Sequence, residues 1–218
     1  MTAPPCGGFA IEHYRGLIRT ALDQGYRFAT FSEHEQVPAK RLFLMRHDID
    51  LSVDLAVNFA RIEAELGIRA TYFVRVHARH YNPFEYHTYR KLREIEALGH
   101  EMGLHYEPGF ADAVGEDPAS LVRREKAIVE ALLGHPVAAA AAHLPSKSGK
   151  TVTEQNLASF GLRYEAYTPR FLEGFKYLSD SNGRWREGCL CGHLGRHDRL
   201  CVLIHHFWWF EKSPVENY

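Results

Sequence analysis

The chain has 218 residues, of which 45% are hydrophobic and 24% are charged. Its 26 basic and 27 acidic residues give a net charge of −1, which offers no electrostatic surface for nucleic acid or an anionic membrane. No apolar run approaches the roughly 20 residues that cross a bilayer, so no membrane span is predicted. This length and apolar content predict a single globular domain over residues 1–218.

The N-terminal residues and the cysteines both favour a cytoplasmic protein. Residues 1–6 lack a basic stretch followed by an apolar core, so no secretory signal is expected. Cys6, Cys189, Cys191 and Cys201 are too few and too clustered for a disulfide framework, which favours reduced thiols. The pattern Cys189-x-Cys191-x-His193 lacks the usual two-residue spacing of a zinc knuckle and a second pair, so no zinc site is expected there.

Short apolar runs alternate with longer segments of helical periodicity, which is the pattern of βα units. The first segments predict a helix over 12–24 and a strand over 26–31. A second strand is predicted over 41–46, and it leads into the polar sequence His47-Asp48-Ile49-Asp50. Ser52 then stands at the N-cap of a helix that Gly67 ends.

The later segments continue the same alternation. Helices are predicted over 84–98 and 118–133, each ended by a glycine. Strands are predicted over 70–76, 100–105, 137–142 and 200–204, with less regular units around 162–167 and 175–178. No repeat, low-complexity stretch or linker interrupts this succession, which predicts a parallel α/β domain.

Polar residues stand at the carboxyl ends of four predicted strands. His47-Asp48-Ile49-Asp50, His105, His143 and His205 each follow an apolar run. In parallel α/β barrels this edge carries the active site, because loops from every strand converge there. One carboxylate after the second strand could hold a divalent metal while its neighbour takes a proton from water. The alternative is that Asp48 or Asp50 only caps the following helix.

The spacing of the histidines separates candidate ligands from structural residues. His100 and His105 are five residues apart and therefore face opposite sides of a strand, so we expect His105 to bind a metal and His100 to be structural. His143 follows five alanines and is expected at or beside the metal, with a plain loop histidine as the alternative. His205 and His206 are adjacent, so their side chains are expected to face opposite sides of an extended chain. We expect His205 to protonate a leaving group and His206 to face away from the site.

Two aromatic segments are candidate substrate contacts. Asp180, Arg184 and Trp185 combine an acid, a guanidinium and an aromatic plane around a turn. Trp185 could stack on a sugar ring, and Arg184 or Asp180 could orient a catalytic group. The alternative is a turn with a packed tryptophan. Trp208, in the aromatic run that follows His205, could wall the same pocket, so all four residues are expected to bind substrate.

Over most of residues 46–209 the chain resembles the polysaccharide deacetylases (NodB-type, carbohydrate esterase family 4), with its nearest similarity to a WbmS-like branch linked to bacterial O-antigen assembly. The resemblance is carried by residues 46–50 (RHDID), 99–105 (GHEMGLH), 143–146 (HLPS), 177–185 (YLSDSNGRW) and 203–205 (LIH). It implies a single domain with a distorted, incomplete parallel (β/α)7 barrel, a divalent ion, and hydrolysis of an N-acyl group on an amino sugar.

The resemblance also implies roles for individual residues. One aspartate of the first motif is the catalytic base and another binds the metal, and we assign Asp48 as the base and Asp50 as the ligand. The reversed assignment is the alternative. His105 takes the place of the first metal-binding histidine, and His205 the place of the general acid.

The chain departs from the pattern of this family at two positions. The family has a second histidine four residues after the first, where this chain has Gly109, and its first motif reads Asp-Asp rather than Asp-x-Asp. His143 stands where the family has arginine. Either His143 supplies the missing metal ligand, beside Asp50 and His105, or metal binding is weakened.

These observations together predict a metal-dependent carbohydrate N-deacetylase. Zinc is the expected ion, with cobalt and nickel as alternatives. The expected substrate is a nucleotide-linked or lipid-linked amino sugar of surface-polysaccharide biosynthesis, and no nucleic-acid partner is expected. Two other functions stay open: a barrel amidase that acts on an amide outside sugar chemistry, and a degenerate member that binds a saccharide without turnover.

Overall fold

A curled, all-parallel sheet forms the centre of the computed structural model, which describes residue 6 and residues 8–218. Its strands pair in the order β6-β5-β4-β3-β2-β8-β7, and β1 pairs with the first half of β2 on the edge that β3 occupies further along. The strand bounds are β1 Tyr26–Ala29, β2 Arg41–Ile49, β3 Thr71–Val74, β4 Glu101–Tyr106, β5 Ala139–Ala142, β6 Tyr164–Glu165, β7 Lys176–Ser179 and β8 Arg199–Ile204. The predicted incomplete parallel α/β barrel is confirmed.

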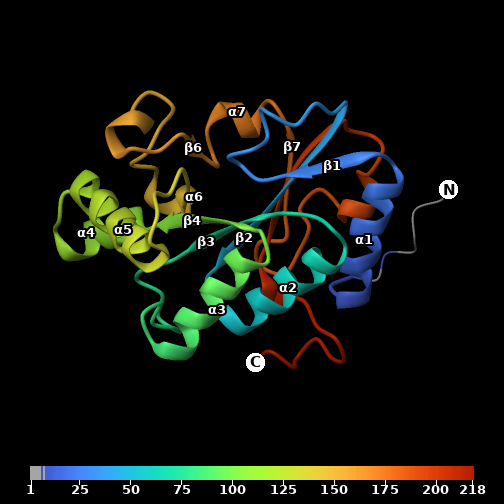
Figure 1. The fold of residues 1–218 in the computed structure, drawn as a ribbon, viewed down its shortest axis with the longest axis horizontal. Coiled ribbons are helices and arrows are strands. Elements are labelled where there is room, and N and C mark those ends of the chain that lie inside the picture. Colours follow the sequence, from blue (N-terminus) through green and yellow to red (C-terminus); the bar gives the residue numbers. More distant parts are fainter. Residues whose placement is uncertain (1–5, 7) are drawn as a thin grey trace.

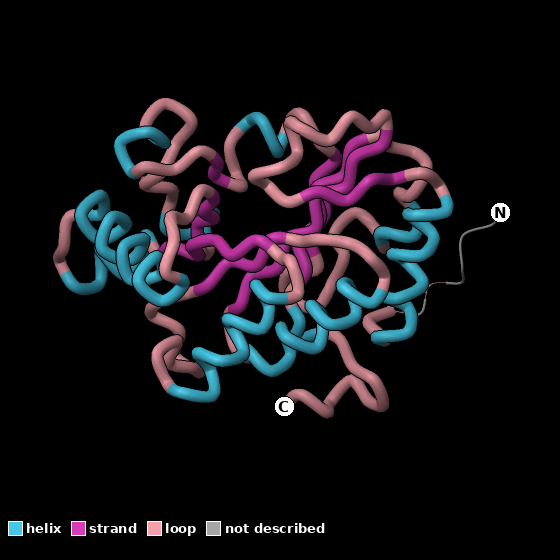
Figure 2. The backbone as a smooth tube through the Cα atoms, viewed as in Figure 1, coloured by secondary structure: helices cyan, strands magenta, loops and turns pink. Residues whose placement is uncertain are grey.

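The long helices lie in an arc around one side of the sheet, and loops with short helices lie on the other (Figures 1 and 2). The α-helices are α1 Ile11–Asp23, α2 Val53–Glu65, α3 Tyr86–Ala97, α4 Pro108–Val114, α5 Pro118–Leu133, α6 Pro145–Ser148 and α7 Pro169–Leu172. Three 3-10 turns are η1 Leu157–Phe160, η2 Leu190–Gly192 and η3 His206–Trp208. No helix of the described residues is long and apolar enough to pass through a lipid bilayer.

The structure differs from the predicted elements in the length of β2 and in three short helices that were not predicted. α5 has the predicted bounds, and Ser52 caps α2 by accepting a hydrogen bond from the backbone N–H of Leu55 at 3.3 Å. β2 continues to Ile49, three residues past its predicted end, because His47 and Asp48 are buried within the sheet. The short helices α4, α6 and α7 each begin at a proline, and their few residues show no helical periodicity.

Side chains alternate between two separate cores, as a strand period of two requires. Along β2, Phe43, Met45 and Ile49 pack against the helices in the larger core. Leu42 and Leu44 point into the barrel and join a smaller core. That smaller core also contains Ala29, Phe31, Phe73, Ala139, Ala141, Tyr164, Ala166, Phe171, Phe175 and Cys201.

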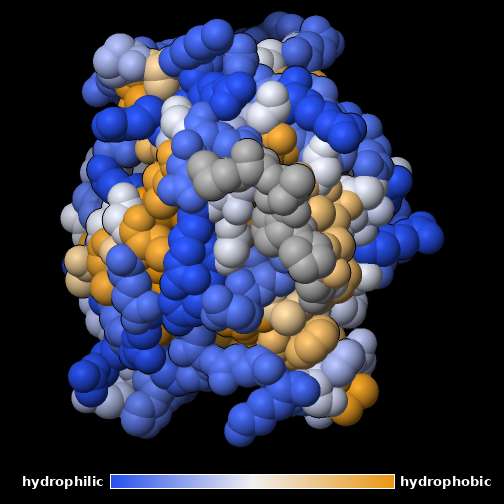
Figure 3. Space-filling view, turned by 90° about the vertical axis from the view of Figure 1, so that its right-hand side faces the viewer, coloured by the Kyte–Doolittle hydropathy of each residue, from blue (hydrophilic) through white to orange (hydrophobic). Residues whose placement is uncertain are grey.

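The smaller core fills the barrel below the carboxyl ends of the strands. Gly103 on β4 allows this packing, because a Cβ there would lie 2.5 Å from the Phe73 ring and 2.9 Å from the Ala139 carbonyl oxygen. Further along the same inward-facing rows, apolar residues give way to Arg46, Asp48 and His105. The barrel interior is therefore apolar at one end and ionisable at the other. The outer face beside α1 is largely hydrophilic, with apolar side chains in small separate patches (Figure 3).

Candidate metal centre and active site

Four strands deliver ionisable side chains to one cleft at the carboxyl edge of the sheet. Asp50 follows β2, His105 lies near the end of β4, His143 follows β5 and His205 follows β8. All four line a cleft of about 490 Å³, together with Asp48 and several aromatic residues. This is the edge at which parallel barrels carry their active sites, and it is where the sequence predicted these residues to converge.

Asp50, His105 and His143 form a group with the spacing of metal ligands. One ligand atom from each lies within 4.8 Å of the others. Asp50 Oδ1 is 3.4 Å from His105 Nε2 and 3.9 Å from His143 Nε2. A tetrahedral ion with bonds of about 2.1 Å keeps its ligand atoms roughly 3.4 Å apart, so the separations suit a shared cation. His143 thus supplies a third candidate ligand beside Asp50 and His105.

The hydrogen bonds of His105 leave its other ring nitrogen facing the carboxylates. His105 Nδ1 donates to the carbonyl oxygen of Ala141 at 2.9 Å, an arrangement that holds the ring of metal-binding histidines in place. Nε2 then points at Asp48 Oδ2 and Asp50 Oδ1, both at 3.4 Å. Oδ1 of Asp50 is buried and has no hydrogen-bond partner among the described residues. A cation between these atoms would satisfy both, so the residues present fit a divalent metal.

His143 is oriented by the turn that follows β5. Its backbone N–H donates to the carbonyl oxygen of Tyr106 at 2.8 Å, which continues the pairing of β5 with β4. Leu144 then adopts a left-handed conformation (φ 49°), which is uncommon for a residue other than glycine and turns the chain sharply into α6. Burial, and next the proximity of His105, lower the pKa of His143 to about 4, so its imidazole is neutral and available as a ligand.

Arg46 holds Asp48 in a fixed, ionised state. Its Nε donates to Asp48 Oδ1 at 2.9 Å and its Nη2 to Oδ2 at 2.8 Å, a two-pronged ion pair on one face of β2. Burial alone would raise the pKa of Asp48, but the charges of Arg46 and His105 outweigh it and lower that pKa. Arg46 itself is fully buried and packs over the rings of Tyr167 and Phe73.

His205 lies next to Asp50 of the metal group, and its ring is held by Asp180. Its Nδ1 donates to Asp180 Oδ1 at 2.6 Å, and its Nε2 lies 3.8 Å from Asp50 Oδ2. Trp209 Nε1 also donates to Asp180, at 2.9 Å, which fixes the carboxylate. Burial alone would lower the pKa of His205, but Asp180, Asp48 and Asp50 outweigh it and raise that pKa to about 9.

His206, next to His205, and His100, five residues before His105, both lie outside the metal group of the cleft. His206 is buried and its ring stacks on that of His47, with centroids 4.8 Å apart. His100 is buried against α2, where its Nε2 donates to the carbonyl oxygen of Ala60 at 2.9 Å. Neither is in the group of candidate ligands among the described residues.

Of the four predicted substrate contacts, the structure brings two to the cleft. Trp185 and Trp208 line it, and the ring of Trp185 is parallel to that of Phe9, with centroids 6.3 Å apart. Arg184 is exposed and does not line the cleft, because the turn before it directs Arg186 there instead. Asp180 is 0% exposed beneath His205, so it orients that histidine and cannot touch a substrate.

Several residues near the ion site were not singled out from the sequence. Arg75 forms an ion pair with Glu107, and its Nη1 lies 3.9 Å from Asp50 Oδ1. Tyr167 and Tyr177 line the cleft beside Arg46. The two-residue spacing of Arg46 and Asp48 already placed them on one face of a strand and could have identified the ion pair. No local pattern marks Arg75, Glu107 or Tyr167, and Tyr177 belongs to the 177–185 segment but was not singled out within it.

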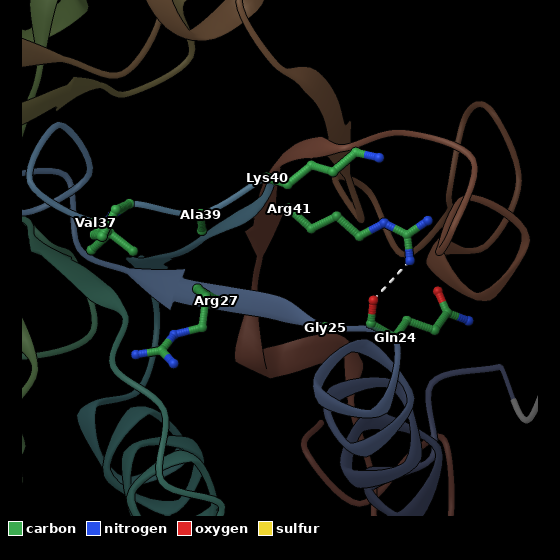
Figure 4. Close-up of a pocket in the computed structure, with 8 residues that line it drawn as sticks. Gln24, Gly25, Arg27, Val37, Ala39, Lys40 and Arg41 are labelled. Carbon is green, nitrogen blue, oxygen red and sulfur yellow. Dashed lines mark hydrogen bonds between the residues drawn. The ribbon is translucent and has the colours of Figure 1, made fainter.

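A second hollow, of about 470 Å³, lies at the opposite edge of the sheet, where β1 and β2 begin (Figure 4). Arg27, Lys40 and Arg41 line it, and Arg41 donates to the carbonyl oxygen of Gln24 at 2.7 Å. Among the described residues that line it there is no histidine, cysteine or carboxylate. The described lining of this hollow therefore offers no acid–base pair.

No protein-family model and no curated protein matches the chain. Its structure is similar to those of three deacetylase-family proteins at low sequence identity. The deacetylase PplD from Streptococcus pyogenes, in complex with acetate, is 15% identical, with 74% of this chain and 84% of that chain covered and a TM-score of 0.46.

BA3943, a CE4 family pseudoenzyme from Bacillus anthracis, is 14% identical, with 78% of this chain and 56% of that chain covered and a TM-score of 0.49. The chitin deacetylase from the fungal pathogen Colletotrichum lindemuthianum is 17% identical, with 80% and 76% covered and a TM-score of 0.46. These structural neighbours are two deacetylases and one CE4 family pseudoenzyme, and at this identity they assign no activity to the chain.

Proposed function

We propose that this chain is a metal-dependent amidase that removes an acetyl or formyl group from the nitrogen of an amino sugar. One observation carries the proposal. A group of three candidate metal ligands shares one cleft with an arginine-held carboxylate, Asp48, and an aspartate-supported imidazole, His205. Amide hydrolysis needs a base for the attacking water and an acid for the departing amine, and this cleft offers one of each beside a cation site.

Asp50, His105 and His143 would hold the ion. When bound, a divalent cation supplies Lewis acidity to the amide carbonyl and to water. The ligand set of one carboxylate and two imidazoles suits zinc, and it also suits cobalt and nickel. His143 would be the third metal ligand, in place of the histidine that the resembling family has where this chain has Gly109. Its Nε2 lies 3.9 Å from Asp50 Oδ1.

Asp48 is the residue suited to take a proton from the attacking water. Arg46 lowers the pKa of Asp48, so the carboxylate is ionised and unprotonated near neutral pH, as a general base must be before it acts. Asp48 lines the cleft beside Asp50 and His105, with its Oδ2 3.4 Å from His105 Nε2, so a water held at the ion site would be within its reach. The water oxygen then bonds to the carbonyl carbon while its proton passes to Asp48.

His205 is the residue suited to protonate the amine nitrogen. With a pKa raised to about 9, its imidazole carries a proton at neutral pH. An amine is a poor leaving group unless it is protonated, so transfer from His205 Nε2 allows the carbon–nitrogen bond to break. The products are a free carboxylic acid and the amino sugar, and the proton taken up by Asp48 balances the one that His205 gives.

The walls of the cleft favour a sugar as the carrier of the amide. Trp185, Trp208, Tyr167 and Tyr177 present aromatic surfaces, and Ser181 stands among the polar groups between them. Aromatic planes next to hydrogen-bonding side chains suit the apolar faces and hydroxyl edges of a pyranose. A volume of about 490 Å³ is within the range of small-molecule sites. The substrate we propose is a nucleotide-linked or lipid-linked amino sugar of surface-polysaccharide (O-antigen) assembly. The protein would then act in the cytoplasm, as a member of the WbmS-like branch.

The test is release of acetate or formate from a panel of free, nucleotide-linked and lipid-linked N-acyl amino sugars. The protein loaded with zinc, cobalt or nickel should release acid from at least one class, and the chelated protein should not. His105→Ala should be as inactive as the chelated protein. A metal-loaded protein that binds a saccharide but releases no acid from any of them would overturn the amidase and favour a binding function.

A further inference from the structure

A second group of candidate metal ligands lies between α1 and the loop that follows β7, away from the cleft. Its members are Cys6, His13, Cys189 and Cys191, and one ligand atom of each lies within 4.8 Å of all the others. His13 Nε2 and Cys189 Sγ are 3.3 Å apart, although the two residues are separated by 176 positions in the chain. In Figure 1 the turn η2 lies against α1 at this point.

The folding of both segments presents these side chains to one point. His13 is on the buried face of α1 and is only 7% exposed. Cys189 and Cys191 flank Leu190, which is buried at 1% and anchors the turn η2 in the core. The turn therefore directs two thiols toward His13, and Cys6 completes the group just before α1.

Neither a disulfide nor ordinary packing accounts for the whole group. All four cysteines of the chain are free thiols, and a disulfide would join only two sulfur atoms at about 2.0 Å. It would leave a third thiol and an imidazole without a role. Three of the chain's four cysteines meet at this point, and only Cys201 is buried elsewhere, so a chance grouping of these thiols does not explain the cluster well.

We propose that Cys6, His13, Cys189 and Cys191 bind one zinc ion as a structural site. Three thiolates and one imidazole form a ligand set that zinc uses in closed, four-coordinate structural sites. A tetrahedral zinc with Zn–S bonds of about 2.3 Å and a Zn–N bond of about 2.1 Å keeps its ligand atoms roughly 3.6–3.8 Å apart, which suits a group confined within 4.8 Å. The soft sulfur ligands select zinc over magnesium, calcium or manganese.

The position of the site gives it a consequence for the cleft. The loop between β7 and η2 carries Trp185, Arg186 and Glu187, which form one wall of the cleft. A zinc ion that joins Cys189 and Cys191 to α1 fixes the far end of this loop to the body of the domain. The site would therefore hold the substrate-binding wall in place without touching the substrate.

The first measurement is zinc per chain in protein produced with zinc and purified without a histidine tag. It is made on the Asp50→Asn/His105→Ala variant, in which the cleft's own ligands are removed. We expect about one zinc per chain, with X-ray absorption showing mainly sulfur neighbours at about 2.3 Å. A variant without zinc, or zinc surrounded only by nitrogen and oxygen, would overturn the proposal. Because the cleft is disabled here, the result is independent of the proposed amidase.

Substitutions then assign the ligands. Adding Cys189→Ser/Cys191→Ser or His13→Gln to this background should remove the zinc, whereas Cys201→Ala and His193→Gln, matched changes outside the group, should keep it. Zinc retained after the cysteine changes would contradict the proposal.

If the cysteine variants are insoluble, cobalt titration of the wild-type apoprotein replaces them. A thiolate-to-cobalt charge-transfer absorption should appear in the near ultraviolet. Its absence would overturn the site, as would zinc-free protein in which two of the three thiols are found linked under non-reducing conditions.

Discussion

At the level of single residues, the alternation of side chains along β2 decides which groups meet in the cleft. Arg46 and Asp48 point into the barrel above Leu42 and Leu44, whereas His47 points outward to the helices. A slip of one residue in the pairing of β2 would bury the ion pair against α2 and expose His47 to the cleft. The chemistry of the site therefore depends on the register of one strand.

The assignment of Asp48 as the base predicts how Asp48→Asn behaves. The variant should still bind one divalent ion in the cleft, because Asp50, His105 and His143 are unchanged, but turnover should fall by about 10²–10⁴-fold. Metal analysis and acid release measure the two effects on the same preparation. If metal binding collapses in Asp48→Asn and survives in Asp50→Asn, the two aspartates have the reverse roles.

The ion pair of His205 with Asp180 predicts a pH dependence. A raised pKa keeps the general acid protonated, so activity should be lost as pH rises through the pKa of His205, which lies at about 9 in the free protein. Asp180→Asn removes the charge that raises this pKa, so the alkaline limb of kcat/KM should move to lower pH. Asp198→Asn, at an exposed position just before β8, is the matched control and should leave the limb in place. An alkaline limb at the same pH in Asp180→Asn would show that His205 is not the acid.

At the level of elements, a buried polar network joins α1 and α2 to the outer face of the sheet. Glu63 of α2 is 0% exposed and accepts hydrogen bonds from Tyr14 at 2.5 Å and from Tyr72 at 2.6 Å. His47 Nε2 lies 2.7 Å from the same carboxylate. Since His47 belongs to β2, this network helps to fix the strand whose register sets the cleft.

Removal of the Glu63 carboxylate should therefore destabilise the fold. Glu63→Ala leaves two buried hydroxyls and an imidazole without their partner and should lower the free energy of unfolding by about 3–5 kcal/mol. Glu63→Gln keeps part of the hydrogen bonding and should cost less, about 1–3 kcal/mol. Denaturant unfolding measures both. Glu65→Ala, on the exposed face of the same helix, should change the free energy by less than about 1 kcal/mol.

The pH dependence of this contribution follows from the direction of the Glu63 shift. Burial raises the pKa of Glu63, but His47, His100 and Tyr14 outweigh it and lower that pKa in the folded state. A lowered carboxyl pKa means that the stabilisation is present above the ordinary glutamate range and is lost as pH falls through the folded-state pKa. The stability gap between wild type and Glu63→Gln should narrow in acid, and a gap that widens there would contradict the network.

Periodicity was sufficient to predict most long elements, and tertiary contacts explain where it failed. The helix α5 was predicted from its spacing of apolar residues and from Gly134, which ends it. The strand β8 was predicted from its continuous apolar run. The extension of β2 to Ile49 could not be predicted, because polar residues continue a strand only where a neighbour such as β3 pairs with them. The short helix α4, which includes Gly109, has only seven residues and shows no helical periodicity.

The site was predictable to the extent that strand ends mark it. Asp48, Asp50, His105, His143 and His205 stand directly at such ends, so one topological rule brought them together. The burial of Asp180 and the exposure of Arg184 depend on the path of an irregular loop, which no periodicity describes. No zinc site was expected at Cys189 and Cys191, because their local pattern lacks a second pair of ligands. Cys6 and His13 lie about 180 positions away in the chain and meet the two cysteines only in the fold.

At the level of the whole molecule, the barrel separates stability from chemistry. Apolar side chains fill the interior below the cleft, and the ionisable residues occupy only its carboxyl edge. The sheet is open between β6 and β7, so the cleft is walled by loops rather than by a closed ring of strands. An open rim with one deep group of ligands suits a bulky sugar substrate whose acyl group alone must reach the ion.

The most direct test of this account is a crystal of the wild-type protein soaked with zinc or cobalt, with the anomalous signal used to locate the ion. We predict a peak in the cleft, about 2.0–2.2 Å from an oxygen of Asp50 and from Nε2 of both His105 and His143. Asp48 and His205 should stand on either side of it without binding it. A cleft that takes up no ion, while the crystal binds metal elsewhere, would contradict the proposed amidase.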